Sequence, residues 1–223
     1  MIRFLMFFLF LSQTLFSQQS QYYQLSAEAF SKLPQIQRPI NPVAPDYELL
    51  DAAIFHQTNL MRKKYGLPPF KLGEGLYHAA RNHSEAMINR DFYDHQNPYN
   101  RSLRNLDDRI EQFDRRYFEL AENIAEIDLI DTPNDFCPER MPNGEYRYMD
   151  CRTHRPYKMM SYWTFAEEAL RLWMESKPHR RNILHPEMRL IGCAVQICKR
   201  PYATEEGPFA RLTQDFASEP LPE

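Results

Sequence analysis

The chain has 223 residues, with 27 Lys and Arg against 30 Asp and Glu and a formal net charge of −3. Because the charges are interspersed and form no basic face, the sequence argues against a nucleic-acid partner. The length suits one domain with a substantial core and is short for two. With 6 Gly against 15 Phe and 13 Tyr, we expect helices with large packed side chains to outweigh tight-turn β architecture.

The first 17 residues predict a cleavable signal peptide. Arg3 supplies the positive charge near the N-terminus, residues 4–11 are apolar, and Ser17 is a small residue at the expected cleavage site. The apolar run is shorter than the roughly 20 residues that a membrane-spanning helix needs, so we expect no stable membrane span after its removal. We therefore expect a secreted protein, extracellular or periplasmic; a retained membrane anchor is the alternative.

The remaining chain is predicted to consist of a leader and one domain. Residues 18–45 are polar, which favours an extended and poorly packed leader. The leader contains four prolines, Pro34, Pro39, Pro42 and Pro45. Residues 46–218 form the predicted domain, and no internal repeat is found in them.

Four stretches have the three- and four-residue apolar spacing of amphipathic helices. They are residues 46–61, 76–87, 103–117 and 164–177. Asp46 can cap the first helix and Gly66 ends it. Thr164 and Glu167 form a capping box for the fourth, which must end near residue 177 because Pro178 disfavours helical geometry at the residue before it.

Two strands are predicted near the end of the chain. Met188–Ile197 is rich in β-branched and apolar residues, and Phe209–Phe216 alternates between two faces. The segment Ala121–Ala125 is too short and mixed to be placed on a strand or a loop, and residues 131–157 predict a long loop. Helices followed by strands indicate an α+β fold, with helices stacked on an antiparallel sheet.

The four cysteines of an exported chain suggest two disulfides, with three possible connectivities. Cys137 with Cys151 would close the long loop. Cys193 and Cys198 would be about 16 Å apart on an extended strand, so they can pair with each other only if the chain turns between them. The spacings match neither a zinc ribbon nor a C-x-x-C redox motif.

Three polar residues lie where the sequence suggests loops or element ends: His95, Glu122 and His179. The chain lacks H-E-x-x-H, G-x-S-x-G, Gly-rich phosphate loops and any catalytic Cys signature. Two imidazoles and one carboxylate suffice for a divalent metal, zinc or another, with an open coordination position. The same three could equally form a polar cluster without metal. His83 shares an apolar helix stripe and is predicted to be a buried structural residue.

These residues lie in segments that resemble a known family. The segments are His56–Arg62, GLPPF at 66–70, Ala79–Met87, DH at 94–95, AENIA at 121–125, Leu172–Leu184, IGCA at 191–194 and TQDF at 213–216. In order and spacing they resemble the CAP superfamily, the SCP/TAPS domain of cysteine-rich secretory, antigen 5 and pathogenesis-related proteins. The match is best with its secreted bacterial branch and covers about residues 46 to 216.

The resemblance implies an α-β-α sandwich with a cleft lined by His95, Glu122 and His179. Some members bind zinc or another divalent ion with the two histidines, and eukaryotic members bind sterols or fatty acids elsewhere. Those members also carry a second acidic residue after the helix Trp. Here that position is Ser176, with Glu175 beside it, and a one-residue shift rotates a helical side chain by about 100°. Whether Glu175 joins the cleft is left open.

Three functions compete on this sequence. The first is a non-enzymatic, monomeric binding module whose His/Glu cleft recognises an unidentified extracellular or envelope ligand, with or without a metal. The alternative is a metal-dependent hydrolase in which His95 and His179 hold the ion and Glu122 is the general base; no other catalytic residue is assigned. The second alternative is lipid or sterol binding, which comes only from the resemblance.

Overall fold

The computed structural model describes residues 19–132 and 135–218, and the predicted signal peptide, residues 1–17, lies outside them. A four-stranded sheet forms the centre, in the order β1 (Lys71–Leu72), β5 (Leu190–Ile197), β6 (Phe209–Ala217) and β2 (Leu120–Asp128). β5, β6 and β2 are antiparallel, whereas the short β1 runs parallel to β5. The two strands predicted near the end of the chain are confirmed as β5 and β6.

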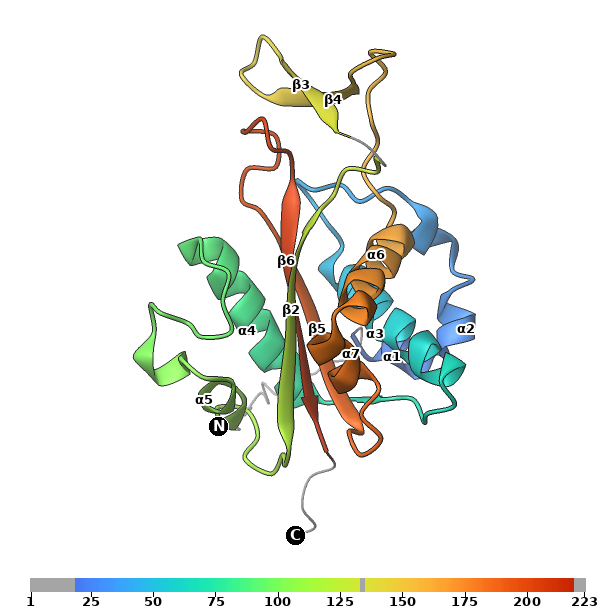
Figure 1. The fold of residues 1–223 in the computed structure, drawn as a ribbon, viewed down its shortest axis with the longest axis vertical. Helices are drawn as coiled ribbons and strands as arrows, with labels where there is room; N and C mark the ends of the chain where they lie inside the picture. Colours follow the sequence, from blue (N-terminus) through green and yellow to red (C-terminus); the bar gives the residue numbers. More distant parts are fainter. Residues whose placement is uncertain (1–18, 133–134, 219–223) are drawn as a thin grey trace, which may run out of the picture.

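Helices cover both faces of this sheet (Figure 1). One face carries α4 (Glu74–Arg90) and α5 (Leu106–Glu111). The other carries α3 (Tyr47–Lys64), α6 (Tyr162–Glu175) and α7 (Lys177–Ile183). The predicted α+β sandwich of helices around a largely antiparallel sheet is therefore confirmed. No helix of the described ranges combines the length and hydropathy of a membrane span.

Helix starts follow local side-chain chemistry, with one correction. Asp46 caps α3 as predicted, since its carboxylate accepts the backbone N–H of Leu49 at 3.0 Å. The predicted start of the fourth helix at Thr164 is wrong, because the hydroxyl of Ser161 accepts the N–H of Thr164 at 3.1 Å and the helix begins at residue 162. Pro178 then lies in the first turn of α7, where the missing N–H is tolerated.

The third predicted helix, over residues 103–117, is mostly wrong. Only α5 and a short 3₁₀ turn, Arg101–Leu103, form there. The carboxylate of Asp114 accepts the backbone N–H of Arg116 at 2.9 Å, a local turn that competes with helix continuation. The apolar spacing continues beyond α5, but no helix forms there, and Phe113 is 43% exposed instead of packed in the core.

The long loop over residues 131–157 contains a hairpin that the sequence did not predict. Its strands are β3 (Phe136–Arg140) and β4 (Tyr146–Asp150), and the disulfide Cys137–Cys151, one of the pairings that the sequence left open, joins their ends, with the Cα atoms 5.0 Å apart. The expected second disulfide is wrong, because Cys193 and Cys198 are free. β5 stays extended through residue 197, so no turn brings these two thiols together.

The expected extended, poorly packed leader is also wrong over its described part. It forms α1 (Gln19–Gln24), α2 (Ala27–Phe30) and a 3₁₀ turn, Pro34–Gln37. Both α1 and α2 contact α3. Phe30 and Ile36 are fully buried in the main core, so these apolar side chains, and not the prolines, decide the packing of this segment.

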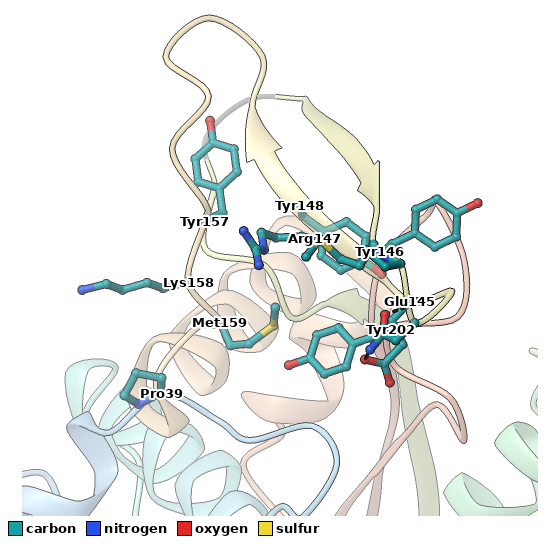
Figure 2. A pocket seen from close by; sticks show the side chains of 12 residues that line it. Pro39, Glu145, Tyr146, Arg147, Tyr148, Tyr157, Lys158, Met159 and Tyr202 are labelled. Atoms are coloured by element: carbon teal, nitrogen blue, oxygen red, sulfur yellow. Dashed lines mark hydrogen bonds between the residues drawn. The ribbon is translucent and has the colours of Figure 1, made fainter.

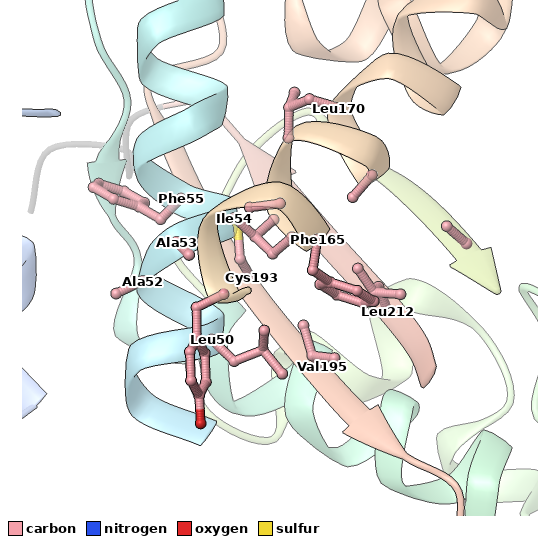
Figure 3. Close-up of a cluster of buried hydrophobic side chains, with 14 of the residues drawn as sticks. Leu50, Ala52, Ala53, Ile54, Phe55, Phe165, Leu170, Cys193, Val195 and Leu212 are labelled. Carbon is pink, nitrogen blue, oxygen red and sulfur yellow. The ribbon is translucent and has the colours of Figure 1, made fainter. Parts of the chain in front are cut away.

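The main core lies between α3, α6 and the sheet (Figure 3). Leu50 and Ile54 of α3 and Phe165 of α6 are at most 1% exposed, and each such side chain stabilises the fold by about 1.5–3 kcal/mol. On the opposite face, α4 lies directly on β5 at Gly192. A Cβ on Gly192 would come within 2.1 Å of the backbone nitrogen of Tyr77, so only glycine permits this approach.

Candidate functional site

The candidate site is centred on Glu122, on the edge strand β2. Its side chain is only 4% exposed, although it belongs to the last strand of the sheet. The AENIA segment, which the sequence left unplaced, is this strand. Glu122 stands opposite Asp215 of β6 in the strand register, so two acidic residues meet at one place on the sheet.

Both oxygens of Glu122 are engaged by other side chains. Oε1 accepts a hydrogen bond from Nδ1 of His95 at 2.8 Å, and Oε2 accepts one from Nη2 of Arg109 at 2.5 Å. Burial opposes ionisation of Glu122, but the His95 hydrogen bond and the Arg109 charge outweigh it and lower the pKa of the carboxyl. An ionised carboxylate can only accept, so the proton of this hydrogen bond belongs to Nδ1 of His95.

His95 is therefore held in one orientation, with Nε2 left for other contacts. The hydrogen bond to Glu122 raises the pKa of His95, and partial burial opposes the shift. The side chain of His95 is 52% exposed, so the ring reaches solvent while its Nδ1 edge is fixed. This is the arrangement in which a carboxylate sets the tautomer of a histidine that meets a ligand.

Arg109 connects Glu122 to the loop that carries His95. Its Nη1 donates to the carbonyl oxygens of His95 and Arg104, each at 3.1 Å. The side chain is 2% exposed and begins on α5. The sequence analysis did not identify Arg109. Its position three residues after Leu106 and next to Ile110 was the available signal, because it places a charged residue beside the apolar face of a helix.

His83 of α4 supports the same loop from behind. It is fully buried, and its Nε2 donates to the carbonyl oxygen of Asp94 at 3.0 Å. Burial lowers the pKa of His83 to about 4, so the ring is neutral at physiological pH. The structural role predicted for His83 is confirmed, since it fixes the residue before His95.

Asp215 is a buried carboxyl behind Glu122 that the sequence did not single out. The side chain is fully buried, and neither of its oxygens has a hydrogen-bond partner within the described structure. Burial raises the pKa of Asp215 well above its ordinary value, and the negative charge of Glu122 raises it further. The charge of Arg109 opposes this shift, but Arg109 and His95 form their hydrogen bonds with Glu122.

The third predicted residue, His179, lies on α7 beside the same stretch of β2. Its carbonyl oxygen accepts from Nδ2 of Asn123 at 3.3 Å. Asn182, one turn later, donates to the carbonyl oxygen of Glu122 at 3.3 Å and to Oδ1 of Asn123 at 2.9 Å. Burial lowers the pKa of His179, and the charge of His95 lowers it further.

Glu175 does not join this cluster. Its side chain is 64% exposed and pairs with Arg171, one turn back on α6, at 2.7 Å. Arg62 and Asn59 of α3 fix neighbouring segments by donating to backbone carbonyl oxygens. Arg62 donates to the carbonyl oxygens of Pro68 at 2.7 Å and Ile183 at 2.8 Å, and Asn59 donates to that of Phe70 at 3.1 Å.

The predicted donors for a divalent metal are His95, His179 and Glu122. Within residues 19–132 and 135–218, no group of three or more His, Cys, Asp and Glu side chains is arranged to hold a metal ion. Both oxygens of Glu122 already accept hydrogen bonds, from His95 and Arg109. Divalent metal binding by His95, His179 and Glu122 stays a prediction.

The fold and the site together define a helix-flanked sheet whose edge strand carries a buried carboxylate, Glu122, bonded to His95 and Arg109. The family model for the cysteine-rich secretory protein family, CAP, matches residues 55–204 of this chain. The chain belongs to the CAP family.

Individual relatives are bacterial. YkwD of Bacillus subtilis (strain 168), named as an uncharacterized protein, is 28% identical over 135 residues, which cover 60% of this chain and 38% of YkwD. An extracellular protein with an SCP domain from Bacillus anthracis str. Ames aligns with a TM-score of 0.51 and 20% identity, over 82% of this chain and 45% of that protein. The chain thus spans less than half the length of either relative, and the second likeness concerns the fold alone.

Proposed function

We propose that this chain is a secreted, non-enzymatic binding module whose His95–Glu122–His179 cleft recognises an extracellular or envelope ligand. The supporting observation is the state of Glu122, whose two oxygens are held by His95 and Arg109. The predicted signal peptide supports export, as does the fold likeness to a Bacillus anthracis protein described as extracellular.

The same observation argues against Glu122 as a general base. A general base needs a free oxygen within reach of the proton that it removes, and a pKa near the working pH. Glu122 is 4% exposed, its oxygens are engaged and its pKa is lowered rather than raised. Its chemistry fits an orienting group for His95, which leaves Nε2 of His95 and the ring of His179 to contact the ligand.

Turnover assays test the non-enzymatic part of this proposal. The purified chain is assayed on ester, peptide and glycan substrates beside His95→Ala, with His185→Ala as the matched control. The carbonyl oxygen of His185 accepts from Arg62 at 3.0 Å, its Nδ1 accepts from the N–H of Glu187 at 3.3 Å, and it contacts none of the three proposed site residues. We expect no turnover by any of the three proteins. Turnover that His95→Ala abolishes in a folded protein, while His185→Ala keeps it, would contradict the proposal.

Zinc titration tests the ligand-contacting role of the two imidazoles. We expect calorimetry with Zn²⁺ to show one site per chain that is lost in both His95→Ala and His179→Ala and kept in His185→Ala. Glu122→Gln should weaken this site about 10- to 100-fold without removing it, as for other groups that orient a metal-binding histidine. Binding that survives both cleft substitutions would contradict the assignment.

A further inference from the structure

A second concave region lies at the β3–β4 hairpin, and none of its lining residues belongs to the cleft. It is a cavity of about 670 Å³, within the roughly 300–1,000 Å³ typical of small-molecule sites. Distant parts of the chain meet there: the hairpin, the segment leading into α6 and the loop between β5 and β6 (Figure 2). The lining residues that matter below are Met141, Arg147, Tyr148, Lys158, Met159 and Tyr202.

Hydrogen bonds within the protein hold the walls of this cavity in place without a ligand. The hydroxyl of Tyr148 donates to the carbonyl oxygen of Thr204 at 2.9 Å, and the backbone N–H of Tyr146 donates to that of Tyr202 at 2.8 Å. On the other side, the N–H of Tyr157 donates to the carbonyl oxygen of Tyr148 at 2.9 Å. The cavity is therefore preorganised, which reduces the entropy lost on binding.

The apolar part of the lining is flat and adaptable. The rings of Tyr148 and Tyr202 are stacked, with centroids 6.5 Å apart and planes inclined at 26°. Met141, Met159 and Tyr202 line the same space, which Figure 2 shows together with Arg147. Aromatic faces favour flat ring partners, and methionine adjusts to their outline.

The charged part of the lining is positive. Arg147 and Lys158 are exposed, and neither side chain has an ion-pair or hydrogen-bond partner in the described parts of the chain. Glu145 is the acidic residue of the lining, and it accepts a hydrogen bond from Asn143 at 2.7 Å. Two cations against one carboxylate, in a chain of net charge −3, attract an anionic group to this place.

We propose that this cavity is a second binding site, for a small anionic molecule with a flat aromatic body. The acidic group of the ligand pairs with Arg147 and Lys158, since a guanidinium offers several donors in the geometry of a carboxylate or sulfonate. The ring lies against Tyr202 and Met159. The inference is independent of the cleft, because the two sites share no residue.

Fluorescence titration with 8-anilinonaphthalene-1-sulfonate tests this site in the whole chain. We expect one saturable site per chain. Arg147→Gln and Lys158→Gln should each raise Kd by up to about fivefold, the range of a single exposed ion pair. Tyr202→Leu should also weaken binding, because it keeps apolar volume and removes the ring. Far-UV circular dichroism and Tm confirm that each variant folds.

The matched control is Arg140→Gln, which removes an exposed cation from the same hairpin but outside the lining. It should leave Kd unchanged. Two comparisons test the ring and the charge of the ligand separately. If a flat ring is preferred to an alkyl chain, 1-naphthoate should displace the dye better than decanoate. If the negative charge contributes to binding, the uncharged N-phenyl-1-naphthylamine should bind more weakly than the dye. No saturable binding, equal weakening by Arg140→Gln, stronger displacement by decanoate, or equally tight binding of the uncharged dye would each overturn the proposal.

Discussion

The proposed cleft at Glu122 and the cavity at the hairpin differ in how their charged side chains are paired. At the proposed cleft, Glu122 and Arg109 are 4% and 2% exposed and are bound to each other and to the loop of His95. At the hairpin, Arg147 and Lys158 are exposed and bind no other side chain of the described residues. Buried charges are therefore committed to fixing His95, whereas the exposed cations are available to a ligand.

The two regions also differ in what keeps them folded. Glu122, Arg109 and His179 stand on β2, α5 and α7, which pack in the main sheet domain, and Arg109 fixes the loop that carries His95. The hairpin has two strands, which are marginal in water by themselves, and relies on the Cys137–Cys151 disulfide and the Tyr148 hydroxyl. Damage to the cleft should thus affect the whole domain, and damage to the hairpin should stay local.

The largest expected effect follows from removing the cation of the cleft. Arg109→Met leaves Glu122 as a buried charge without its partner, which should lower the free energy of unfolding by about 3–5 kcal/mol. Urea denaturation measures it. Arg109→Met combined with Glu122→Gln should recover part of this loss, because it removes both charges.

The control for this prediction is Arg104→Met. Arg104 is exposed on the same segment and should change the free energy of unfolding by no more than about 0.5 kcal/mol. Equal losses in Arg104→Met and Arg109→Met would mean that the buried pair has no special role.

The next largest effect concerns the hairpin. Replacing Cys137 and Cys151 together by serine opens a loop of sequence separation 14, worth about 3 kcal/mol of chain entropy. Amide hydrogen exchange should accelerate in β3 and β4 and remain slow in β5 and β6. If the variant unfolds globally at a temperature at which the parent is native, the claim that damage to the hairpin stays local is wrong.

A smaller effect is expected on the titration of His95. Its pKa is raised above the ordinary value of about 6.5 by the hydrogen bond to Glu122, so Glu122→Gln should lower the pKa measured by NMR. The stability that comes from the raised pKa of His95 is fully present below about pH 6.5 and is lost as the pH rises through the folded-state pKa of His95. The lowered pKa of Glu122 acts in the opposite direction, since its contribution is lost as the pH falls through the folded-state pKa of Glu122.

The smallest effect is predicted for Glu175. Its pair with Arg171 is exposed, so Glu175→Ala should change neither Tm nor the His95 titration measurably. A changed titration of His95 would place Glu175 in the cleft after all.

The sequence predicted what depends on local pattern or on motif. The cap at Asp46, the strands β5 and β6 and the Cys137–Cys151 bridge were all found this way. His95, Glu122 and His179 came from the family resemblance, and two of them bond directly.

What the sequence could not predict depends on contacts between distant segments. Arg109 matters only because α5 places it between Glu122 and the His95 loop. Asp215 matters because the register of β2 on β6 sets it opposite Glu122. The hairpin has no hydrophobic period, and its cavity exists only where Tyr202 and Lys158 meet it.

The most direct measurement is the tautomer of His95, read from the ¹⁵N chemical shifts of its ring at a pH above its pKa. If Glu122 orients His95 as an ionised acceptor, Nδ1 carries the proton and Nε2 is the bare nitrogen, and Glu122→Ala abolishes this preference. A neutral His95 protonated on Nε2 in the parent protein would contradict the account, because the carboxylate would then not be fixing the ring.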